Sequence, residues 1–407
     1  MPPKTRVITA RELQSLLIRI GAASTGKKST LVERLGRDIT RPRLLNRHAK
    51  CNRLRPADSK LRIMSIDMGI KNLAFCEAEV SYPAKDSLNA TMEVLRWEKV
   101  DLAPATQHVA LQGPGPSPLN QDNFDADEGA DLYSVGVLSK TAYGLVKKTI
   151  LAGAPDVVLI EKQRWRSGNG SAVQQWTLRV NTLEGMLWAV LETLHTEQLL
   201  MLQKEGGVNE EKRLYEVHGI DPKRVGHYWL EQNAQRLASE DNVTDVVDVE
   251  QDTSATAKLS RSKAEKKAKI ALLRSWFVAS PASTASTTCA TTPTISFAIG
   301  KNAEPTRRAL CSPPKSTRAR KSSSTAPNSV ESLADDVPVA ELRKLDDITD
   351  CFLQAAAWVS WESNRRKLWD IWRKRLEQRH GSESDDESLA RELDGEVLLD
   401  MAREVEA

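Results

Sequence analysis

The chain has 407 residues, of which 58 are Lys or Arg and 55 are Asp or Glu, so its formal net charge at pH 7 is only +3. This length suffices for two domains with connecting segments, and the small net charge does not by itself indicate a nucleic-acid partner. The distribution of charge is more informative. The first fifty residues hold twelve basic side chains against three acidic ones, whereas the last part of the chain is largely acidic. A basic end that faces nucleic acid and a solvated acidic tail are therefore expected.

Cysteine usage and hydropathy narrow the class of protein further. The five cysteines are scattered and form no CxxC pair, which argues against a disulfide framework and a structural zinc site and favours a reducing intracellular compartment. No apolar run approaches the roughly twenty residues that cross a bilayer, so no membrane partner is expected. The Arg-rich, acid-poor beginning of the chain suits either a mitochondrial presequence or DNA binding.

Residues 1–41 form the first predicted unit. Thr9 and Glu12 have the spacing of a helix capping box, and an apolar side chain then recurs at helical spacing up to Ile20. The stretch GAASTGKKST that follows has the spacing of a Walker A phosphate loop. However, Lys28 stands where a Ser or Thr would bind magnesium, and a helix precedes the loop instead of a buried strand. We therefore predict helix, Gly-rich turn and helix, and reject a nucleotide site.

The segment from Thr9 to Arg37, with its GKK and LVERL strings, resembles the SAP motif, a small helix-turn-helix module that binds DNA. Four basic side chains of this segment are then expected to neutralise phosphates of a nucleic-acid backbone without reading bases. They are Lys27, Lys28, Arg34 and Arg37. The alternative is an ordinary solvated pair of basic helices.

A basic, irregular linker is expected over residues 42–60, and a globular unit over residues 61–237. The apolar strings LRIMSID, IKNLAFCEAEV and MEVLRWEKVDL predict three strands, and a Pro- and Gly-rich surface loop follows them. Further along, the pattern predicts a helix over residues 132–151, a strand at VVLIE, a long helix over residues 176–202, a strand at YEVHGI and a short helix over residues 222–230.

Composition changes sharply over residues 238–340. The Ser-, Thr- and Pro-rich runs there cannot bury enough apolar surface to fold, so a largely disordered insertion is expected, with one basic amphipathic helix at KLSRSKAEKKAKIALLRSWF. A helical part follows over residues 341–380, and an acidic tail over residues 381–407. Strands first, and then alternating helices and strands, predict an α/β fold with a mixed sheet.

Acidic side chains stand where several of these apolar elements begin or end. Asp67 closes the first strand, Glu161 closes VVLIE, and the long helix near residue 350 starts with Asp346, Asp347 and Asp350. Carboxylates from two strands and one helix could converge at one end of a sheet. Hard divalent cations prefer such oxygen ligands. Two of these ions, about 4 Å apart, would activate a water molecule and stabilise the leaving oxygen in phosphodiester hydrolysis.

Each of these acids also has an ordinary structural explanation. The aspartates near residue 350 could complement a helix dipole, and Asp67 could cap the turn after its strand. Glu161 could form an exposed ion pair with Lys162 or Arg164, which would contribute little to stability. Their joint placement at the ends of three elements favours a shared function.

Three blocks of the sequence resemble those of the fungal mitochondrial Holliday-junction resolvases, relatives of bacterial RuvC within the ribonuclease H-like fold. The blocks are SIDMGIKNLAFC, IEKQRWRSG and KLDDITDCFLQAAAWVSWESN, and YEVHGIDPKRVGHYW resembles the segment that precedes the third. The resemblance spans residues 61 to about 375, apart from the insertion. It implies an α/β, ribonuclease H-like mixed sheet flanked by helices. It also implies a structure-selective, Mg²⁺-dependent endonuclease, with Mn²⁺ as a substitute, that resolves four-way junctions in mitochondrial DNA recombination.

The resemblance also assigns roles to residues. Asp67, Glu161 and two of the three aspartates Asp346, Asp347 and Asp350 would bind Mg²⁺, and Asp347 and Asp350 match the RuvC-type spacing best. A homodimer would place two sites on opposite strands of the junction. The long helix over residues 176–202 is a candidate for its interface, although such an apolar stripe is more often part of an ordinary core. Contacts with phosphates near the cut are expected from Lys71, Asn72, Gln163, Arg164 and Arg166.

Two other functions compete with this hypothesis. A catalytically inactive scaffold, tethered to DNA by the SAP-like module, would bind without cutting, but the presence of all the acids argues against it. The string DMGIKN could also be the phosphate loop of an actin-like ATPase. That fold needs a second Gly-rich phosphate loop and an adenosine-binding motif, and the sequence shows neither.

Overall fold

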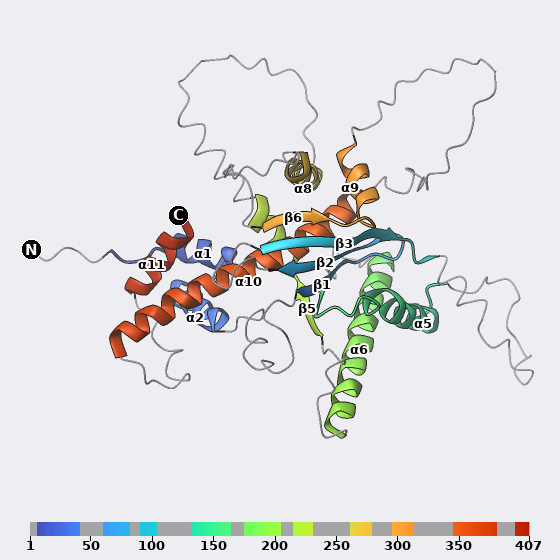
Figure 1. The fold of residues 1–407 in the computed structure, drawn as a ribbon, viewed down its shortest axis with the longest axis horizontal. Helices are drawn as coiled ribbons and strands as arrows, with labels where there is room; N and C mark the ends of the chain where they lie inside the picture. Colours follow the sequence, from blue (N-terminus) through green and yellow to red (C-terminus); the bar gives the residue numbers. More distant parts are fainter. Residues whose placement is uncertain are drawn as a thin grey trace, which may run out of the picture.

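The computed structural model of the chain describes residues 6–40, 60–81, 90–103, 132–163, 175–204, 215–230, 261–278, 295–312, 345–380 and 395–406. Within these ranges, six strands form one sheet with helices on both faces (Figure 1). The strands are β1 (Leu61–Asp67), β2 (Leu73–Ser81), β3 (Ala90–Val100), β4 (Val157–Glu161), β5 (Glu216–Ile220) and β6 (Ile295–Ile299).

The helices alternate with these strands along most of the chain. They are α1 (Ala10–Arg19), α2 (Lys28–Ile39), α5 (Val135–Leu145), α6 (Gln175–Lys204), α8 (Arg261–Val278), α9 (Glu304–Cys311), α10 (Leu345–His380) and α11 (Gly395–Glu406). A π-helical turn, Val146–Ile150, follows α5, and residues 222–230 form a short helix after β5. No helix in the described ranges is long and apolar enough to cross a membrane.

The sheet is mixed, as predicted, and its strand order is β5-β4-β1-β2-β3-β6. The chain runs antiparallel through β1, β2 and β3, whereas β4 pairs parallel with β1, and β5 pairs parallel with β4. Parallel neighbours present their carboxyl ends at the same edge of the sheet. That edge therefore collects the residues that close β1, β4 and β5.

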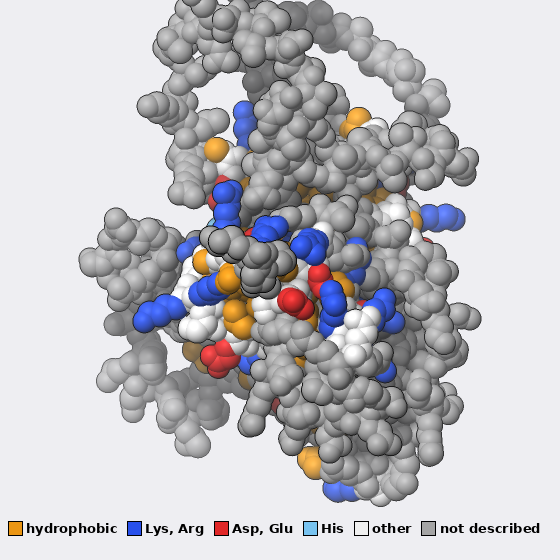
Figure 2. All heavy atoms as spheres, turned by 90° about the vertical axis from the view of Figure 1, so that its left-hand side faces the viewer, with side chains coloured by type: hydrophobic (Ala, Val, Ile, Leu, Met, Phe, Trp, Pro, Cys, Tyr) orange, Lys and Arg blue, Asp and Glu red, His pale blue; other side chains and the backbone are white. Residues whose placement is uncertain are grey.

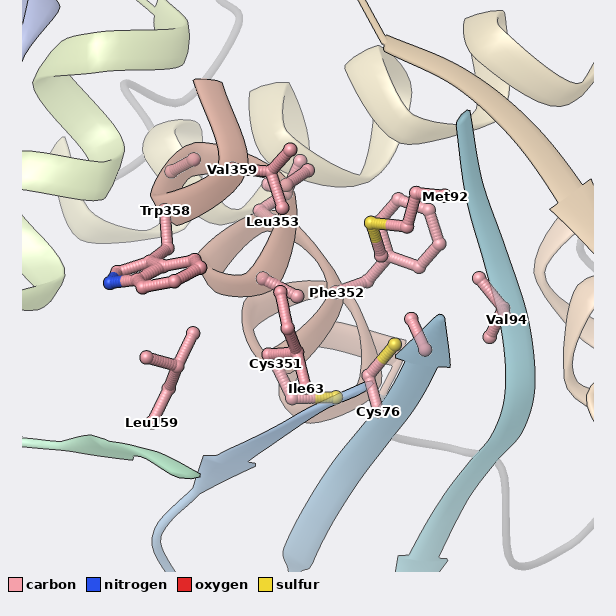
Figure 3. Close-up of a cluster of buried hydrophobic side chains, with 14 of the residues drawn as sticks. Ile63, Cys76, Met92, Val94, Leu159, Cys351, Phe352, Leu353, Trp358 and Val359 are labelled. Carbon is pink, nitrogen blue, oxygen red and sulfur yellow. The ribbon is translucent and has the colours of Figure 1, made fainter. Parts of the chain in front are cut away.

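One face of the sheet is covered by α10, and α8 packs against α10 on its outer side. Figure 3 shows Cys351 of α10 beside Ile63 and Cys76 of the central strands, and the ring of Phe352 beside Met92 of β3. Three successive small residues of α10, Ala355, Ala356 and Ala357, are completely buried. Because successive residues of a helix point in different directions, α10 is covered on several sides at this level.

Polar contacts position α10 along the sheet more precisely than apolar packing alone. Gln354 is almost fully buried, and its side-chain amide donates a hydrogen bond to the Ser65 hydroxyl at 3.0 Å. At the start of the helix, the Trp97 indole N–H of β3 donates to the carbonyl of Ile348 at 2.8 Å. Buried polar groups without partners are costly, so both bonds oppose sliding of the helix. The aspartates at the start of α10 are thereby held near the end of β1.

The opposite face of the sheet is covered by α5 and α6 (Figure 1). Leu183, Leu187 and Leu191 of α6 are completely buried there, and Met186, Val190 and Leu194 pack against the same core. The apolar stripe predicted for this long helix is therefore core packing within one chain.

The first two helices form the predicted helix-turn-helix unit, and its capping box is present. The Thr9 hydroxyl accepts a hydrogen bond from the Glu12 backbone N–H at 3.2 Å, and the Glu12 carboxylate accepts one from the Thr9 N–H at 2.6 Å. The turn contains Gly21 and Gly26, both with positive φ, +66° and +137°, which other residues rarely adopt.

This unit is docked against α10 from the middle of that helix onward. The Asn364 side-chain amide donates to the carbonyl of Arg19 at 2.8 Å, and the Arg365 guanidinium donates to the carbonyl of Ile20. A Cβ atom on Gly21 would lie 2.2 Å from the indole of Trp361, so only glycine fits at this contact. The unit shares one core with α10 and α11, which includes Leu13, Leu17, Leu31, Leu35, Leu368, Trp372, Val397 and Met401.

The prediction of a largely disordered insertion over residues 238–340 was wrong for residues 295–312. Residues of β6 pair parallel with β3 at the edge of the sheet, and α9 follows with Ala303 and Leu310 buried. The short apolar string ISFAI has too little surface to fold alone, but the open edge of β3 supplies its hydrogen-bonding partner. Pairing with β3 thus outweighs the local composition, which predicted disorder. The predicted basic helix forms as α8, whereas residues 238–260, 279–294 and 313–340 lie outside the described residues.

The prediction of a solvated acidic tail over residues 381–407 was wrong in part as well. Its last segment forms α11, and Val397, Leu398 and Met401 are buried against α1 and α10. These residues recur at helical spacing, so one face of α11 is apolar although the segment as a whole is acidic. The predicted linker lies outside the described residues apart from Lys60.

Candidate active site

Asp67 and Glu161 lie side by side at the carboxyl ends of the parallel strands β1 and β4. The strand register pairs Ile66 with Ile160, so the next residue on each strand is a carboxylate. Both isoleucines are completely buried. A one-residue slip would turn them toward the opposite face of the sheet, away from the core that they share with Met64 and Val158, so packing specifies the register that brings the two acids together. A hydrogen bond joins the two carboxyl side chains.

The first turns of α10 bring further acids to the same edge of the sheet. Asp347 and Asp350 lie three residues apart and flank Ile348, which is buried against the sheet. Residues at this spacing share one face of a helix. Both carboxylates are close enough to Asp67 to raise its pKa. The structure thus brings together Asp67, Glu161, Asp347 and Asp350, whereas their role as metal ligands stays a prediction.

Burial and like charge make this an unfavourable place for ionised carboxylates. Burial raises the pKa of Asp67 well above its usual range, and the carboxylates of Glu161, Asp350 and Asp347 raise it further. Burial also raises the pKa of Asp350, against the opposing effect of Lys269. Such perturbed groups in a cleft are typical of functional sites.

Three lysines lie among the aspartates of α10, and the sequence prediction included none of them. Lys269 of α8 is almost fully buried and donates to Asp350 at 3.0 Å, while Lys99 of β3 lies 3.3 Å from Asp347. Lys266 donates to Asp346 at 2.6 Å and is half exposed. Although burial alone would lower the pKa of Lys269, the carboxylates of Asp350, Glu265 and Glu161 raise it. The ammonium group is therefore charged at neutral pH.

The sequence shows the basic residues of two of these lysines' helix, but it does not show that the helix lies against the aspartates. The basic helix that carries Lys266 and Lys269 was predicted, but its position was not. Its contact with α10 joins segments about eighty residues apart. Nothing in the spacing of its charges shows that one face lies against a cluster of acids.

The donor set suits a hard divalent cation, because it consists of carboxylate oxygens that repel one another in a buried place. Within the described ranges, no group of three or more acidic, histidine or cysteine side chains is already arranged as a metal cage. Two of the four carboxylates form ion pairs, Asp347 with Lys99 and Asp350 with Lys269. An ion held by all four would have to replace these lysines as the partner of each aspartate.

A cleft of about 400 Å³ opens beside these acids. Its wall includes Glu161 and Asp347, together with three of the residues predicted to contact phosphates: Lys71, Asn72 and Gln163. Lys71 is exposed, and Asn72 and Gln163 are half-buried. The backbone N–H of Gln163 donates to Glu184 at 3.1 Å, which holds the start of this loop against α6. Arg164 and Arg166, also predicted to contact phosphates, lie outside the described residues.

The predicted DNA-binding residues of the SAP-like module differ in their surroundings. Lys27 and Lys28 are exposed at the start of α2, and Arg37 is exposed beside Asp38, at 3.1 Å. Arg34 is half-buried, and its guanidinium donates to the carbonyls of Ala23 and Thr25, so it stabilises the turn. Figure 2, which views the end of the molecule with α1, α2 and α11, shows more Lys and Arg than Asp and Glu side chains on the described part of that face. DNA binding by this module stays a prediction.

A larger cavity, of about 570 Å³, lies away from the acids. It is lined by Glu77, Arg96 and Gly153, among others, and Gly153 accepts a hydrogen bond from Arg62 at the opposite end of β1 from Asp67. Glu77 is buried and forms an ion pair with Arg96, which satisfies its charge. The volume of a cavity therefore does not identify the candidate active site, because the clustered acids lie beside the smaller cleft.

Comparison with known proteins identifies the family to which the chain belongs. Residues 63–368 match a family model described as mitochondrial resolvase Ydc2 / RNA splicing MRS1. The chain is 27% identical over 168 residues to the mitochondrial cruciform cutting endonuclease 1 of Schizosaccharomyces pombe, an alignment that covers 41% of this chain and 52% of the relative. It thus spans about half the length of that relative. The mitochondrial cruciform cutting endonuclease 1 of Saccharomyces cerevisiae is 24% identical over 316 residues, which cover 77% of this chain and 72% of the relative.

Solved structures with some likeness include two resolvases. The yeast mitochondrial Holliday junction resolvase Ydc2 is 18% identical, with coverage of 90% of this chain and 99% of that one, and the TM-score is 0.44. RuvC of Thermus thermophilus is 14% identical, with coverage of 47% and 86%, and the TM-score is 0.21.

Proposed function

The chain belongs to the mitochondrial resolvase Ydc2 / RNA splicing MRS1 family, and from this premise we propose that it is a divalent-metal-dependent endonuclease that cuts four-way DNA junctions in mitochondria. Its two curated relatives are named cruciform cutting endonucleases and mitochondrial proteins, which supports both the substrate and the location. The further assignment to Mg²⁺, with Mn²⁺ as a substitute, rests on the carboxylate donor set, which both ions accept.

One observation carries the proposal. Acids that are about 280 residues apart in sequence meet at one edge of the sheet, beside an open cleft with exposed basic side chains. A purely structural role would not require several carboxylates in a place where burial and mutual repulsion raise the pKa of Asp67. Clustered carboxylates of this kind destabilise the folded state, and a catalytic role would explain their presence.

Four side chains would hold the ions: Asp67, Glu161, Asp347 and Asp350. When bound, the cations would supply activation of a water molecule and stabilisation of the leaving oxygen in phosphodiester hydrolysis, leaving 5′-phosphate and 3′-hydroxyl ends. Asp67 is the most buried of the four, and its neighbours on β1 cannot move, so it would orient the other ligands. Lys71, exposed at the mouth of the cleft, would attract the phosphate backbone, with Asn72 and Gln163 beside it to bond phosphate oxygens.

A homodimer is the assembly that two symmetric cuts in a junction require, and it is part of the proposal. The buried stripe of α6 is not available for such an interface, because Leu183, Leu187 and Leu191 fill the core of their own chain. The exposed apolar residues of the same helix, Leu178, Leu200 and Met201, remain for contact with a second copy.

The family description also names RNA splicing, and a catalytically inactive scaffold is a second candidate from the sequence. Either function would need a basic surface but not a set of clustered acids. The proximity of Asp67, Glu161, Asp347 and Asp350, two of which, Glu161 and Asp347, line one cleft, favours the nuclease.

Cleavage of a synthetic four-way junction, compared with a linear duplex of the same sequence, tests the proposal. We expect the purified protein to cut the junction in Mg²⁺ or Mn²⁺, and to leave the duplex intact. Asp67→Asn should keep junction binding and lose cutting. Binding without any cutting by the unaltered protein would instead support a scaffold.

A further inference from the structure

An exposed tryptophan lies at the rim of the cleft that contains the acids. Trp176, at the start of α6, is 39% exposed, although burial of its large ring would be favourable. It lines the same cleft as Glu161 and Asp347. Singly exposed apolar side chains are common on proteins. Contacts with Lys71 and Tyr133 distinguish this ring from such a residue.

The ring of Trp176 is held by an aromatic and cationic cluster. Tyr133, in the turn before α5, meets Trp176 edge to face, with the ring centroids 5.5 Å apart. The Arg179 guanidinium lies over the ring of Tyr133, 4.6 Å from its centroid. The Lys71 ammonium lies over Trp176 itself, 5.9 Å from the centroid. These contacts orient the indole and place two positive charges near it, while more than a third of its surface stays open.

An exposed aromatic ring with cations beside it is suited to a ligand that has both a flat ring and a negative charge. Bases stack on aromatic side chains whatever their sequence, while neighbouring lysines and arginines hold the attached phosphates. A metabolite with a single anionic group would use the cations but not the ring. A nucleotide within a DNA strand uses both, and the strand would run from Trp176 to the acids within one cleft.

We propose, on the basis of the junction-cutting function proposed above, that Trp176 stacks against one unpaired nucleobase next to the phosphate that is cut. Strands exchange partners at the centre of a four-way junction, so a base there leaves its helix at a lower cost than a base inside a duplex. Trp176 therefore selects for the junction over linear DNA. Tyr133 and Arg179 are positioning residues that hold the indole, and Lys71 moves from the ring to the phosphate of the bound strand.

A double-mutant cycle between Trp176 and single bases of the junction tests this assignment. Junction binding is measured in an Asp67→Asn background with Mg²⁺, so that the strands stay intact, and each nucleotide near the exchange point is replaced in turn by an abasic site. One position should weaken binding by about tenfold, which is the order expected for loss of one base stack. Trp176→Leu should weaken binding of the intact junction by a similar factor and should abolish the effect of that abasic site.

Two control variants distinguish loss of base stacking from a nonspecific effect of substitution on junction binding. Trp176→Phe keeps an aromatic surface and should retain most of the coupling, and Tyr143→Leu, which alters another exposed aromatic residue on α5, should leave it unchanged. An abasic penalty of equal size with and without Trp176, or no penalty at any position, would overturn the assignment. Cutting of the intact junction by the unaltered protein, measured in parallel, reports on the proposed nuclease function independently.

Discussion

The first turns of α10, here the site end, and its part from Trp361 onward, here the docking end, use charged side chains in opposite ways. At the site end, Asp347 lines a cleft, and Asp347 and Asp350 pair with lysines from other elements. About 18 Å of helix beyond Asp350, at about 1.5 Å per residue, Glu362 and Arg365 form a buried ion pair within the helix. The first group is open to a ligand, and the second holds the SAP-like module through the carbonyl of Ile20.

This difference shows how one helix connects two regions of the molecule. At the site end, burial and, after it, the neighbouring carboxylates raise the pKa of Asp67, an arrangement that does not favour stability and that supports the proposed binding of a cation. At the docking end, Glu362 is completely buried and Trp361 lies against Gly21. That end is built for stability and fixes the direction of the module relative to the acids.

Asp67→Asn should have the largest effect and should act on the site end alone. Loss of one ligand for the ions is expected to lower the cleavage rate by about a thousandfold, which is the order seen when one group that stabilises developing charge is removed. Single-turnover cleavage of a four-way junction measures this, with junction affinity as the control. Normal cutting by this variant would remove Asp67 from the mechanism.

Glu362→Gln should instead destabilise the packing of the docking end of α10. Removal of the carboxylate from a buried ion pair costs about 3 kcal/mol in the free energy of unfolding, because the Arg365 guanidinium loses its compensating charge. Denaturant unfolding measures this.

Glu304→Gln is the matched control for that variant, since Glu304 pairs with Arg307 at the same i,i+3 spacing on the surface and should cost under about 1 kcal/mol. Equal losses for Glu362→Gln and Glu304→Gln would contradict a distinct docking end.

Lys27→Gln together with Lys28→Gln should weaken junction binding by about tenfold and leave the folded state unchanged. Each phosphate contact that is lost should lower the slope of log affinity against log salt by about one, so this slope should fall by about two. These substitutions are preferable to removal of residues 1–41, because truncation would expose the apolar surface of α10 and α11.

The control for this pair is Lys147→Gln with Lys148→Gln, which alters two exposed lysines of the π-helical turn after α5. We expect this control to bind the junction normally. An unchanged salt slope for the Lys27 and Lys28 variant would show that the module does not contact the phosphate backbone.

The smallest predicted effect concerns pH and stability in the absence of metal. Burial and the neighbouring carboxylates raise the pKa of Asp67 in the folded state, so the folded protein holds this proton more tightly than the unfolded chain does. Stability should therefore fall as pH rises from the ordinary pKa of an aspartate, near 4, through the raised value. Asp67→Asn should weaken this fall and raise the melting temperature at pH 7 by a few degrees. A lower melting temperature for the variant in EDTA would contradict it.

Local signals in the sequence account for most of the sheet and for the acids. Asp67 and Glu161 could be predicted because each directly follows a short apolar strand, and strands of this kind end at a sheet edge. The start of α10 could be predicted because its helical pattern is long and begins with acids.

Features that depend on contacts between distant segments could not be predicted in this way. Lys269 reaches Asp350 across eighty-one residues of sequence, and β6 folds only because β3 offers an open edge. The apolar face of α11 was hidden by the acidic composition around it, and its partner surface on α1 and α10 exists only in the folded chain. Spacing shows what a helix can bury, but it does not show which surface will cover it.

Metal-directed cleavage of the polypeptide tests most directly whether distant acids share bound ions. Fe²⁺ replaces Mg²⁺ in the purified protein, and ascorbate with peroxide then generates radicals that cut the backbone close to the bound ion. We predict fragments that end near Asp67, near Glu161 and near residues 347–350 in the same sample, and their loss when excess Mg²⁺ is added. Cuts at only one of these places, or cuts that excess Mg²⁺ does not suppress, would contradict a shared metal site.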